Sequence, residues 1–140
     1  MTTYRKQPLI QLFSESSRTK LFTCRKPLVK IVLHLACVGW NITVSSGKRN
    51  EEAQNYAFYR GWSKCHWPTS DHNTEPLSSA VDIAPYIEGI GIPWHEETPW
   101  IVLAGAFLTT AEELGYCVEW GGFYPGLKDL GHFSLKEQTE

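Results

Sequence analysis

The chain has 140 residues, which suits one domain of ordinary size. Hydrophobic residues make up 42% of it and aromatic residues 13%, enough to bury one core, so the composition excludes a disordered chain. The formal net charge of -2 shows no excess of Lys and Arg, and no nucleic-acid partner is therefore expected.

The first part of the chain lacks the signals of export and membrane insertion. Residues 1–11 contain no apolar run of signal-peptide length, and the most apolar segment, residues 31–40, is too short to span a bilayer. We therefore expect synthesis in the cytoplasm without a signal peptide and without membrane insertion. Residues 8–17 predict a short helix or an ordered arm.

A helical pattern begins at Lys26, with Pro27 in its first turn and Gly39 at its expected end. Its apolar residues recur at steps of three and four: Leu28, Ile31, Val32, Leu35 and Val38. Residues 41–46 are β-branched and alternating, which predicts a strand. Asn50 is a good cap for a second helix through Tyr59, which Gly61 would end.

The middle of the chain, residues 63–79, is polar and predicts a long ordered loop, a kind of segment that is often functional. Residues 80–84 then predict a short strand that Pro85 would stop. Thr98 is expected to cap a long helix with Pro99 at its first position and Gly115 at its end. The predicted apolar stripe of this helix is Ile101, Ala104, Leu108, Ala111 and Leu114.

The last third predicts a strand over residues 116–120, a loop over 121–131 and a final strand over 132–135. Helices interleaved with short strands in a small chain favour an α+β fold with an antiparallel sheet and helices packed around it. No repeat or linker divides the chain, so residues 1–140 are expected to form a single domain.

The four cysteines, Cys24, Cys37, Cys65 and Cys117, form no Cys-x-x-Cys pair, so the sequence supports neither a zinc ribbon nor a thioredoxin-like motif. We expect free thiols buried as small hydrophobic side chains in a reducing cytoplasm. One or two disulfides remain an alternative, because the sequence does not give Cα separations.

Two histidines and one aspartate are candidate metal ligands. His72 lies in the polar loop, Asp82 in the strand after it, and His132 opens the last strand. Such a set leaves a fourth position open for water, which is typical of catalytic zinc sites. Asp129, three residues before His132, could then accept a proton from that water. The alternative is a set of ordinary polar residues, with Asp82 simply facing solvent.

Other candidates have simpler explanations. His95-Glu96 begins like the helical motif His-Glu-x-x-His, but position 99 is Pro, so that site does not exist. Cys65 and His66 are an alternative metal pair, although adjacent residues rarely bind one tetrahedral ion. His34 is expected to be a packed or surface residue. Glu119 is the second candidate for the base.

Several short motifs in the same order resemble the LAS-type zinc peptidases, the family of D-Ala-D-Ala carboxypeptidases and L-Ala-D-Glu endopeptidases that includes VanX and VanY relatives and phage endolysins. The motifs are Ser46-Gly-Lys-Arg49, Gln54, Ser70-Asp-His72, residues 80–86, Leu103-Ala-Gly105, Leu114-Gly115, Trp120-Gly-Gly122 and residues 129–133. The similarity covers about residues 20–135 and is greatest to small phage members. It implies the fold that these peptidases share with the hedgehog signalling domain.

The resemblance also implies roles for individual residues. His72, Asp82 and His132 would bind one Zn²⁺ ion, Asp129 would be the general base, and Arg49 would stabilise the carbonyl oxygen as it becomes anionic. Three more residues would contact substrate or form the pocket wall: Ser70, Gln54 and Trp120. The ten-residue step from His72 to Asp82 is longer than the family's usual step, and Gly131 replaces a common Pro, which is expected to loosen the approach to His132.

The implied function is hydrolysis of peptidoglycan stem peptides, at L-Ala-D-Glu or next to D-Ala, by a monomeric endolysin-like enzyme acting on the cell wall. Without a signal peptide, such an enzyme would be released by a holin-type partner that opens the membrane. One alternative is a non-catalytic zinc-containing binding module of the same fold, against which Asp129 and Arg49 argue. Another is a bacterial carboxypeptidase that trims D-Ala, which would be expected to carry an export signal.

Overall fold

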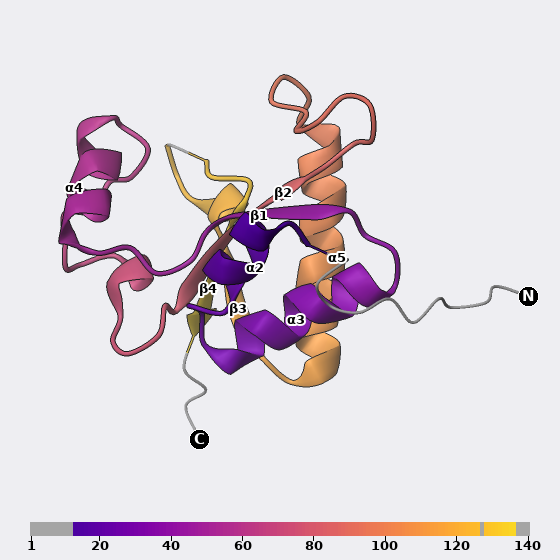
Figure 1. The fold of residues 1–140 in the computed structure, drawn as a ribbon, viewed down its shortest axis with the longest axis horizontal. Helices are drawn as coiled ribbons and strands as arrows, with labels where there is room; N and C mark the ends of the chain where they lie inside the picture. Colours follow the sequence, from indigo (N-terminus) through magenta and orange to yellow (C-terminus); the bar gives the residue numbers. More distant parts are fainter. Residues whose placement is uncertain (1–12, 127, 137–140) are drawn as a thin grey trace, which may run out of the picture.

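The structure, a computed structural model, describes residues 13–126 and 128–136. Its strands, β1 (Ile42–Ser46), β2 (Ala80–Pro85), β3 (Cys117–Trp120) and β4 (His132–Lys136), form one antiparallel sheet in the order β1-β2-β4-β3. Its helices are α2 (Glu15–Leu21), α3 (Lys26–Cys37), α4 (Glu51–Tyr59) and α5 (Thr98–Leu114), with 3₁₀ turns η1 (Asp71–Asn73) and η2 (Gly121–Phe123). The predicted α+β fold is confirmed. Figure 1 shows α4 at one end of the molecule, apart from α3 and α5.

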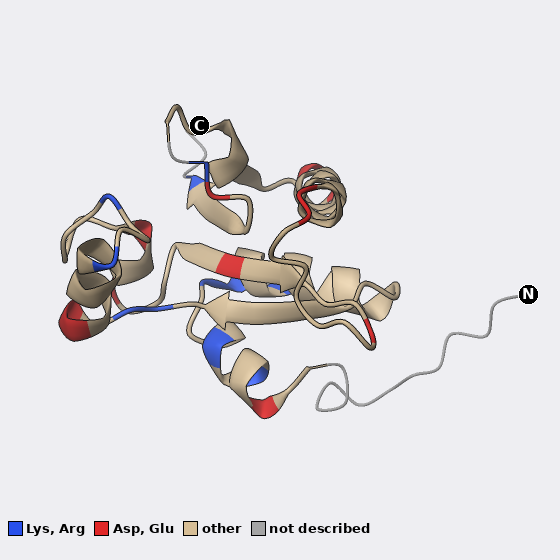
Figure 2. Cartoon of the chain, turned by 90° about the horizontal axis from the view of Figure 1, so that it is seen from above, with Lys and Arg blue, Asp and Glu red and all other residues tan. Residues whose placement is uncertain are grey.

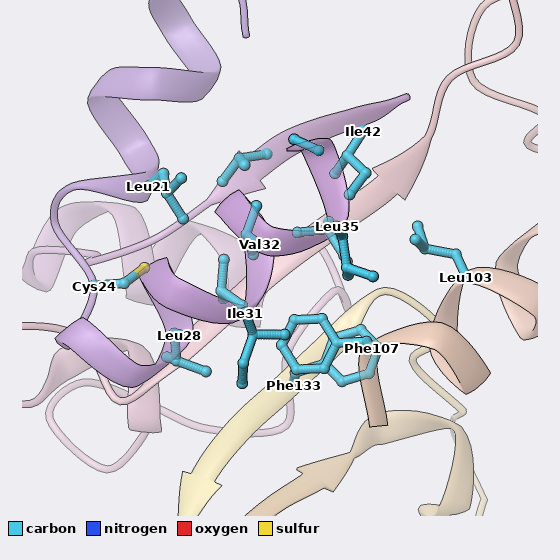
Figure 3. Packing of buried hydrophobic residues seen from close by; sticks show 14 of the residues in the cluster. Leu21, Cys24, Leu28, Ile31, Val32, Leu35, Ile42, Leu103, Phe107 and Phe133 are labelled. Atoms are coloured by element: carbon cyan, nitrogen blue, oxygen red, sulfur yellow. The ribbon is translucent and has the colours of Figure 1, made fainter. Parts of the chain in front are cut away.

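One face of the sheet is apolar and packs on α3 and α5. Alternate residues of β2, Val81 and Ile83, are buried on this face, and Phe133 of β4 lies opposite Val81. Phe133 stacks on Phe107 of α5 with 3.9 Å between ring centroids, and the apolar residues of α3 surround this pair (Figure 3). Truncating a buried Phe of this kind to Ala typically costs about 3–5 kcal/mol of stability.

The other face of the sheet carries polar residues at its centre. Asp82 of β2 lies directly opposite His132 of β4, and Ala80 lies opposite Ser134. Residues opposite each other on antiparallel strands have Cβ atoms roughly 5 Å apart, so the register alone brings Asp82 and His132 together. If the strand pairing slipped by one residue, Asp82 and His132 would face the apolar core. Burying these polar side chains without partners is costly, so the observed register is strongly favoured.

Helix boundaries mostly follow the predicted signals. Asn50 caps α4, its side chain accepting a hydrogen bond from the Ala53 amide at 2.8 Å, and Gly115 ends α5 with φ +81°. The predicted cap at Thr98 is wrong by one residue. Thr98 is already helical, Glu97 is the N-cap, and no side chain closes the turn. Pro99 is tolerated because the first amides of a helix have no partner within it.

The predicted stripe of α5 is also partly wrong. The buried residues are Leu103, Ala104, Phe107, Thr110 and Ala111, whereas the predicted Ile101 and Leu114 are 47% and 42% exposed. The predicted stripe and the buried stripe of α5 both have helical spacing, and they share Ala104 and Ala111. The stripe that contains Phe107 is the buried one, because it packs against α3 and the sheet. Helical periodicity does not identify which stripe will be buried.

The first described helix lies later than predicted. The predicted segment 8–17 falls partly outside the described residues, and α2 begins at Glu15 after a Ser14 cap and continues to Leu21. Ser17 of this helix accepts a hydrogen bond from the Val44 amide at 3.0 Å, which fixes α2 beside β1.

All four cysteines are free, as predicted, but only Cys24 is buried. Burial raises the pKa of the Cys24 thiol to about 12, so this residue acts as a hydrophobic side chain. Cys37 and Cys117 are exposed, which corrects the expectation that all four are buried.

The described helices include none with the length and apolarity needed to cross a bilayer. Figure 2 shows the Lys and Arg residues scattered over helices and loops among the acidic ones, in agreement with the composition.

Candidate metal centre

Three side chains from separate segments meet on the polar face of the sheet. His72 comes from η1, Asp82 from β2 and His132 from the start of β4, and their ligand atoms all lie within 4.8 Å of one another. His72 Nε2 is 3.3 Å from His132 Nδ1 and 3.3 Å from Asp82 Oδ2, and His132 Nδ1 is 3.0 Å from Asp82 Oδ1. Among the described residues this is the single group of three or more His, Cys, Asp or Glu that could hold a metal ion.

Hydrogen bonds orient both imidazole rings toward this point. His72 Nδ1 lies 2.7 Å from the Gly47 carbonyl oxygen, which can only accept, so Nδ1 donates to it and Nε2 is the nitrogen that faces the candidate centre. His132 Nε2 lies 2.8 Å from Ser134 Oγ, and a proton donated there leaves Nδ1 as the free nitrogen. Outer hydrogen bonds that fix the tautomer in this way are typical of metal-binding histidines.

The spacing of these atoms fits zinc. A tetrahedral ion with Zn–N and Zn–O bonds of about 2.0–2.1 Å separates its ligand atoms by about 3.3 Å. The three measured separations, 3.0–3.3 Å, agree with that value. A bound cation would stabilise two imidazole nitrogens and a carboxylate oxygen that lie so close together. Three ligands of this kind would leave a fourth tetrahedral position for water or substrate.

A cation already accompanies the ligand carboxylate. Arg49 Nη2 donates a hydrogen bond to Asp82 Oδ2 at 2.8 Å. Burial on its own would raise the pKa of Asp82, but the charge of His72 and the hydrogen bond to His132 hold that pKa below its ordinary value. Asp82 thus faces the site rather than open solvent, and it remains ionised at neutral pH.

The same interaction affects His132. Burial lowers the pKa of the imidazole, but the hydrogen bond to Asp82 and the charge of that carboxylate outweigh burial and leave the pKa above its ordinary value of 6.5. In the metal-free protein a proton therefore competes for Nδ1, the atom that faces the centre.

The long segment between the first two ligands folds back on itself. Thr74 Oγ1 donates to the Leu77 carbonyl oxygen at 2.7 Å and accepts from the Ser79 amide at 2.8 Å. The Ser79 amide also lies 2.9 Å from the Asp71 carbonyl oxygen. The ten-residue step is therefore closed by one threonine hydroxyl, and both ligands reach the same point.

Asp129 reaches the site from the loop before β4. Its backbone lies against Gly121, where an added Cβ would be 2.4 Å from the Asp129 carbonyl oxygen, so only glycine fits there. Burial, and then the negative charge of Asp82, raise the pKa of Asp129 above its ordinary value. Glu119, the second candidate for the base, is 48% exposed and 3.8 Å from Lys136.

Two hollows adjoin the centre and share Arg49, Trp62 and Asp129. The smaller, about 300 Å³, is otherwise lined by Ser63, Lys64, Cys65, Thr69, Ser70, Asp71, His72, Tyr124 and His132. The larger, about 600 Å³, is otherwise lined by Ser45, Gly61, Asp82, Ile83, Trp94, Trp100, Lys128 and Gly131. The first is polar and the second is rich in tryptophan, so a ligand that spans the centre meets two different environments.

The three residues predicted to contact substrate lie in different environments. Ser70 lines the smaller hollow, and its hydroxyl caps η1 by accepting from the His72 amide at 3.2 Å. Gln54 is fully buried and lies behind the wall, where its side chain contacts Arg49. Trp120 is 9% exposed, lines neither hollow and donates to the Leu130 carbonyl oxygen, so it belongs to the core.

Two further expectations are corrected or narrowed. Gly131 does not loosen the approach to His132, because a Cβ there would lie 2.4 Å from the Ile83 carbonyl oxygen in a closely packed position. His66 stacks on Phe58 with 3.5 Å between ring centroids and is not part of the described metal-binding group.

Four further groups lie at the site although the sequence did not predict them there: the side chains of Ser134, Tyr124 and Lys64 and the Gly47 carbonyl. Ser134 had a usable signal, because residues i and i+2 of a strand share a face and His132 stands two positions before it. The Gly47 contact uses a backbone carbonyl, which no side-chain pattern reveals.

Comparison with known proteins gives one consistent result. Residues 10–131 match the family model described as phage L-alanyl-D-glutamate peptidase. Among solved structures, the L-Ala D-Glu endopeptidase ChiX of Serratia marcescens is similar over 89% of this chain and 89% of that chain, with 30% sequence identity and a TM-score of 0.74. No match was found among curated proteins.

Proposed function

Because the chain belongs to the phage L-alanyl-D-glutamate peptidase family, we propose that it is a zinc endopeptidase that hydrolyses the L-Ala–D-Glu bond of peptidoglycan stem peptides. The observation that carries the proposal is the convergence of His72, Asp82 and His132 at the spacing of a tetrahedral ion. The family and the similar solved structure favour an endopeptidase over a D-Ala carboxypeptidase, since both are described by the L-Ala–D-Glu activity.

His72, Asp82 and His132 would hold the ion. The chemistry that zinc supplies in such a site is Lewis acidity, which polarises a carbonyl and makes water nucleophilic near neutral pH. The Gly47 carbonyl accepts from His72 Nδ1, and the Ser134 hydroxyl is placed to accept from His132 Nε2, which would leave the other nitrogen of each ring for the ion.

Asp129 is proposed as the general base. It borders both hollows, so a scissile peptide spanning the centre passes beside it. Its raised pKa makes it a stronger base than an ordinary aspartate. Asp129 takes a proton from the attacking water as the C–O bond forms, and it passes that proton to the leaving amine as the C–N bond breaks.

Arg49 is proposed to stabilise the carbonyl oxygen as it becomes negative. A guanidinium has five N–H donors. In this structure Nε donates to Ser46, Nη1 to Gln54 and Nη2 to Asp82. Two donors remain for substrate, and the three bonds hold them in fixed positions, which is the preorganisation that transition-state stabilisation needs.

Mass spectrometry of muropeptides after digestion of purified peptidoglycan tests the proposed bond. We expect new fragments that begin with D-glutamate, while loss of terminal D-Ala alone would identify a carboxypeptidase and contradict the proposal. Binding to the polymer without any new fragment would identify the non-catalytic module.

Two variants test the assigned roles. Asp129→Ala should abolish cleavage and keep about one zinc per chain, whereas the matched control Glu119→Ala should cut normally. Normal cleavage by the Asp129 variant would show that another group is the base. His72→Ala should lose zinc; an unchanged metal content would contradict the ligand assignment.

A lysis role follows from the family's phage description. In this proposal the monomeric enzyme reaches the wall after a holin-type partner opens the membrane. Added from outside, it should lyse cells whose outer permeability barrier has been removed, and Asp129→Ala should not.

A further inference from the structure

The smaller hollow contains one cation that has no ion-pair partner among the described residues. Two basic side chains line it, Arg49 and Lys64. Arg49 is bound to the ligand carboxylate of Asp82 at 2.8 Å. No described carboxylate forms an ion pair with Lys64, and Asp71, an acidic residue that lines the same hollow, pairs with Lys136 at 3.4 Å.

Lys64 is an exposed residue that lines this hollow and lies close to a loop on its other side. It follows α4, yet its ammonium group lies beside Gly126, where a built Cβ would be 3.3 Å from Nζ. Gly126 belongs to the loop that also carries Tyr124 and Asp129, on the other wall. The exposed lysine therefore reaches toward that loop while lining the same hollow as His72 and His132.

The segment that carries Lys64 is held by a buried side chain. Gln54, fully buried, donates from Nε2 to Ser63 Oγ at 3.0 Å and to the Cys65 carbonyl oxygen at 2.8 Å. The same glutamine accepts from Arg49 through Oε1 at 3.4 Å. Gln54 thus contacts the proposed oxyanion-binding arginine and both neighbours of Lys64, Ser63 through its side chain and Cys65 through its carbonyl oxygen, so the segment that carries the lysine has a defined position in the site.

The larger hollow differs in chemistry. Three tryptophans line it, and two of them, Trp62 and Trp94, are 59% and 68% exposed. Aromatic faces of this kind suit the apolar faces of sugar rings and acyl groups better than a carboxylate. Lys128 also borders this hollow, so it is the natural control for a general effect of positive charge.

A peptide cut between L-Ala and D-Glu places a carboxyl group beside the broken bond. In a stem peptide the D-glutamate continues the chain through its γ-carboxyl, so its α-carboxyl, on the carbon that bears the leaving nitrogen, is either a free carboxylate or an amide. We propose that Lys64 binds this α-carboxylate and so places the leaving side of the substrate in the smaller hollow and the muramyl side in the tryptophan-lined one. This inference rests on the proposed function.

The test is the preference between two synthetic substrates that differ in one group. Both are N-acyl-L-Ala-γ-D-Glu-L-Lys peptides with an amidated C-terminus, and one carries a free D-Glu α-carboxylate where the other has the amide. We expect the zinc-loaded wild-type enzyme to favour the carboxylate in kcat/KM by about two- to fivefold, the range of an exposed ion pair. Lys64→Met should remove that preference, mainly by raising KM for the carboxylate substrate. Lys64→Arg keeps a positive charge and should retain much of the preference.

The controls separate the possible failures. Lys128→Met should keep the wild-type preference; if it removes the preference and Lys64→Met does not, the substrate lies in the opposite direction and the inference is wrong. Equal rates on both substrates with the wild-type enzyme also overturn it, although cleavage itself supports the proposed function. If the enzyme cleaves neither substrate, the proposed function is wrong, and this inference is wrong with it. Circular dichroism and zinc content verify that each variant is folded.

Discussion

Ser134→Ala should weaken zinc binding without removing any ligand. The Ser134 hydroxyl is fully buried and lies 2.8 Å from His132 Nε2, two positions along β4. Without it, Nε2–H has no partner, and leaving such a buried group unsatisfied costs about 1–3 kcal/mol. The ring can avoid that cost by moving its proton to Nδ1, where the carboxylate of Asp82 accepts it. That tautomer no longer offers a lone pair to the metal.

The expected loss is about ten- to a hundredfold in zinc affinity, the effect usually seen when an outer partner of a ligand is removed, or about 1.4–2.7 kcal/mol. Competition with a chromogenic chelator at fixed pH measures the affinity. Ser45→Ala is the matched control, because the Ser45 hydroxyl is exposed and contacts only the backbone of Asp82, at 3.3 Å.

Thermal unfolding of the metal-free variants separates metal binding from fold stability. If Ser134→Ala binds zinc within about twofold of wild type, the hydrogen bond does not select the tautomer, and the explanation given for the orientation of His132 is wrong.

Asp129→Asn should lower kcat on a stem peptide by about 10²–10⁴-fold while zinc content stays unchanged; a loss of zinc would instead make this residue a ligand. Zinc affinity should fall by up to about tenfold per pH unit as the pH drops below the pKa of His132, and because that pKa lies above 6.5, chelator titrations should detect the fall already near neutrality. Gly131→Ala should destabilise the fold by about 1–3 kcal/mol in chemical unfolding, since its Cβ would lie 2.4 Å from the Ile83 carbonyl oxygen. Gly105→Ala, with nothing within 4 Å, should stabilise α5 by about 0.5–1 kcal/mol, and equal effects at the two glycines would contradict the packing described.

Local chemistry made much of the fold predictable. Lys26-Pro27, Asn50 and Gly115 act through capping and backbone preferences within a few residues of themselves, so their helix ends were found at or near the predicted positions. Alternation over residues 41–46 predicted β1 for the same reason. The errors concern a choice between similar local patterns, as at Thr98 and in the buried stripe of α5.

The sequence predicted which three residues would come together at the candidate centre, but not how the side chains around them would face. His72, Asp82 and His132 were recognised because motifs in a fixed order stand around them, and the structure brings them together. Gln54 and Trp120 were expected at the substrate, yet each is buried in a neighbouring contact. Whether a polar or aromatic side chain faces a hollow depends on packing from several segments at once.

The sequence by itself therefore determined the fold class, most helix and strand positions and the three candidate ligands, because these depend on residue type, short-range spacing and ordered motifs. The tertiary structure alone decided that Thr74 closes the long step between the first two candidate ligands, that Ser134 and the Gly47 carbonyl contact the imidazoles, and that Lys64 lines the smaller hollow. Those contacts join residues that are distant in the chain or involve backbone atoms, and only the closure of the sheet and loops gives them their geometry.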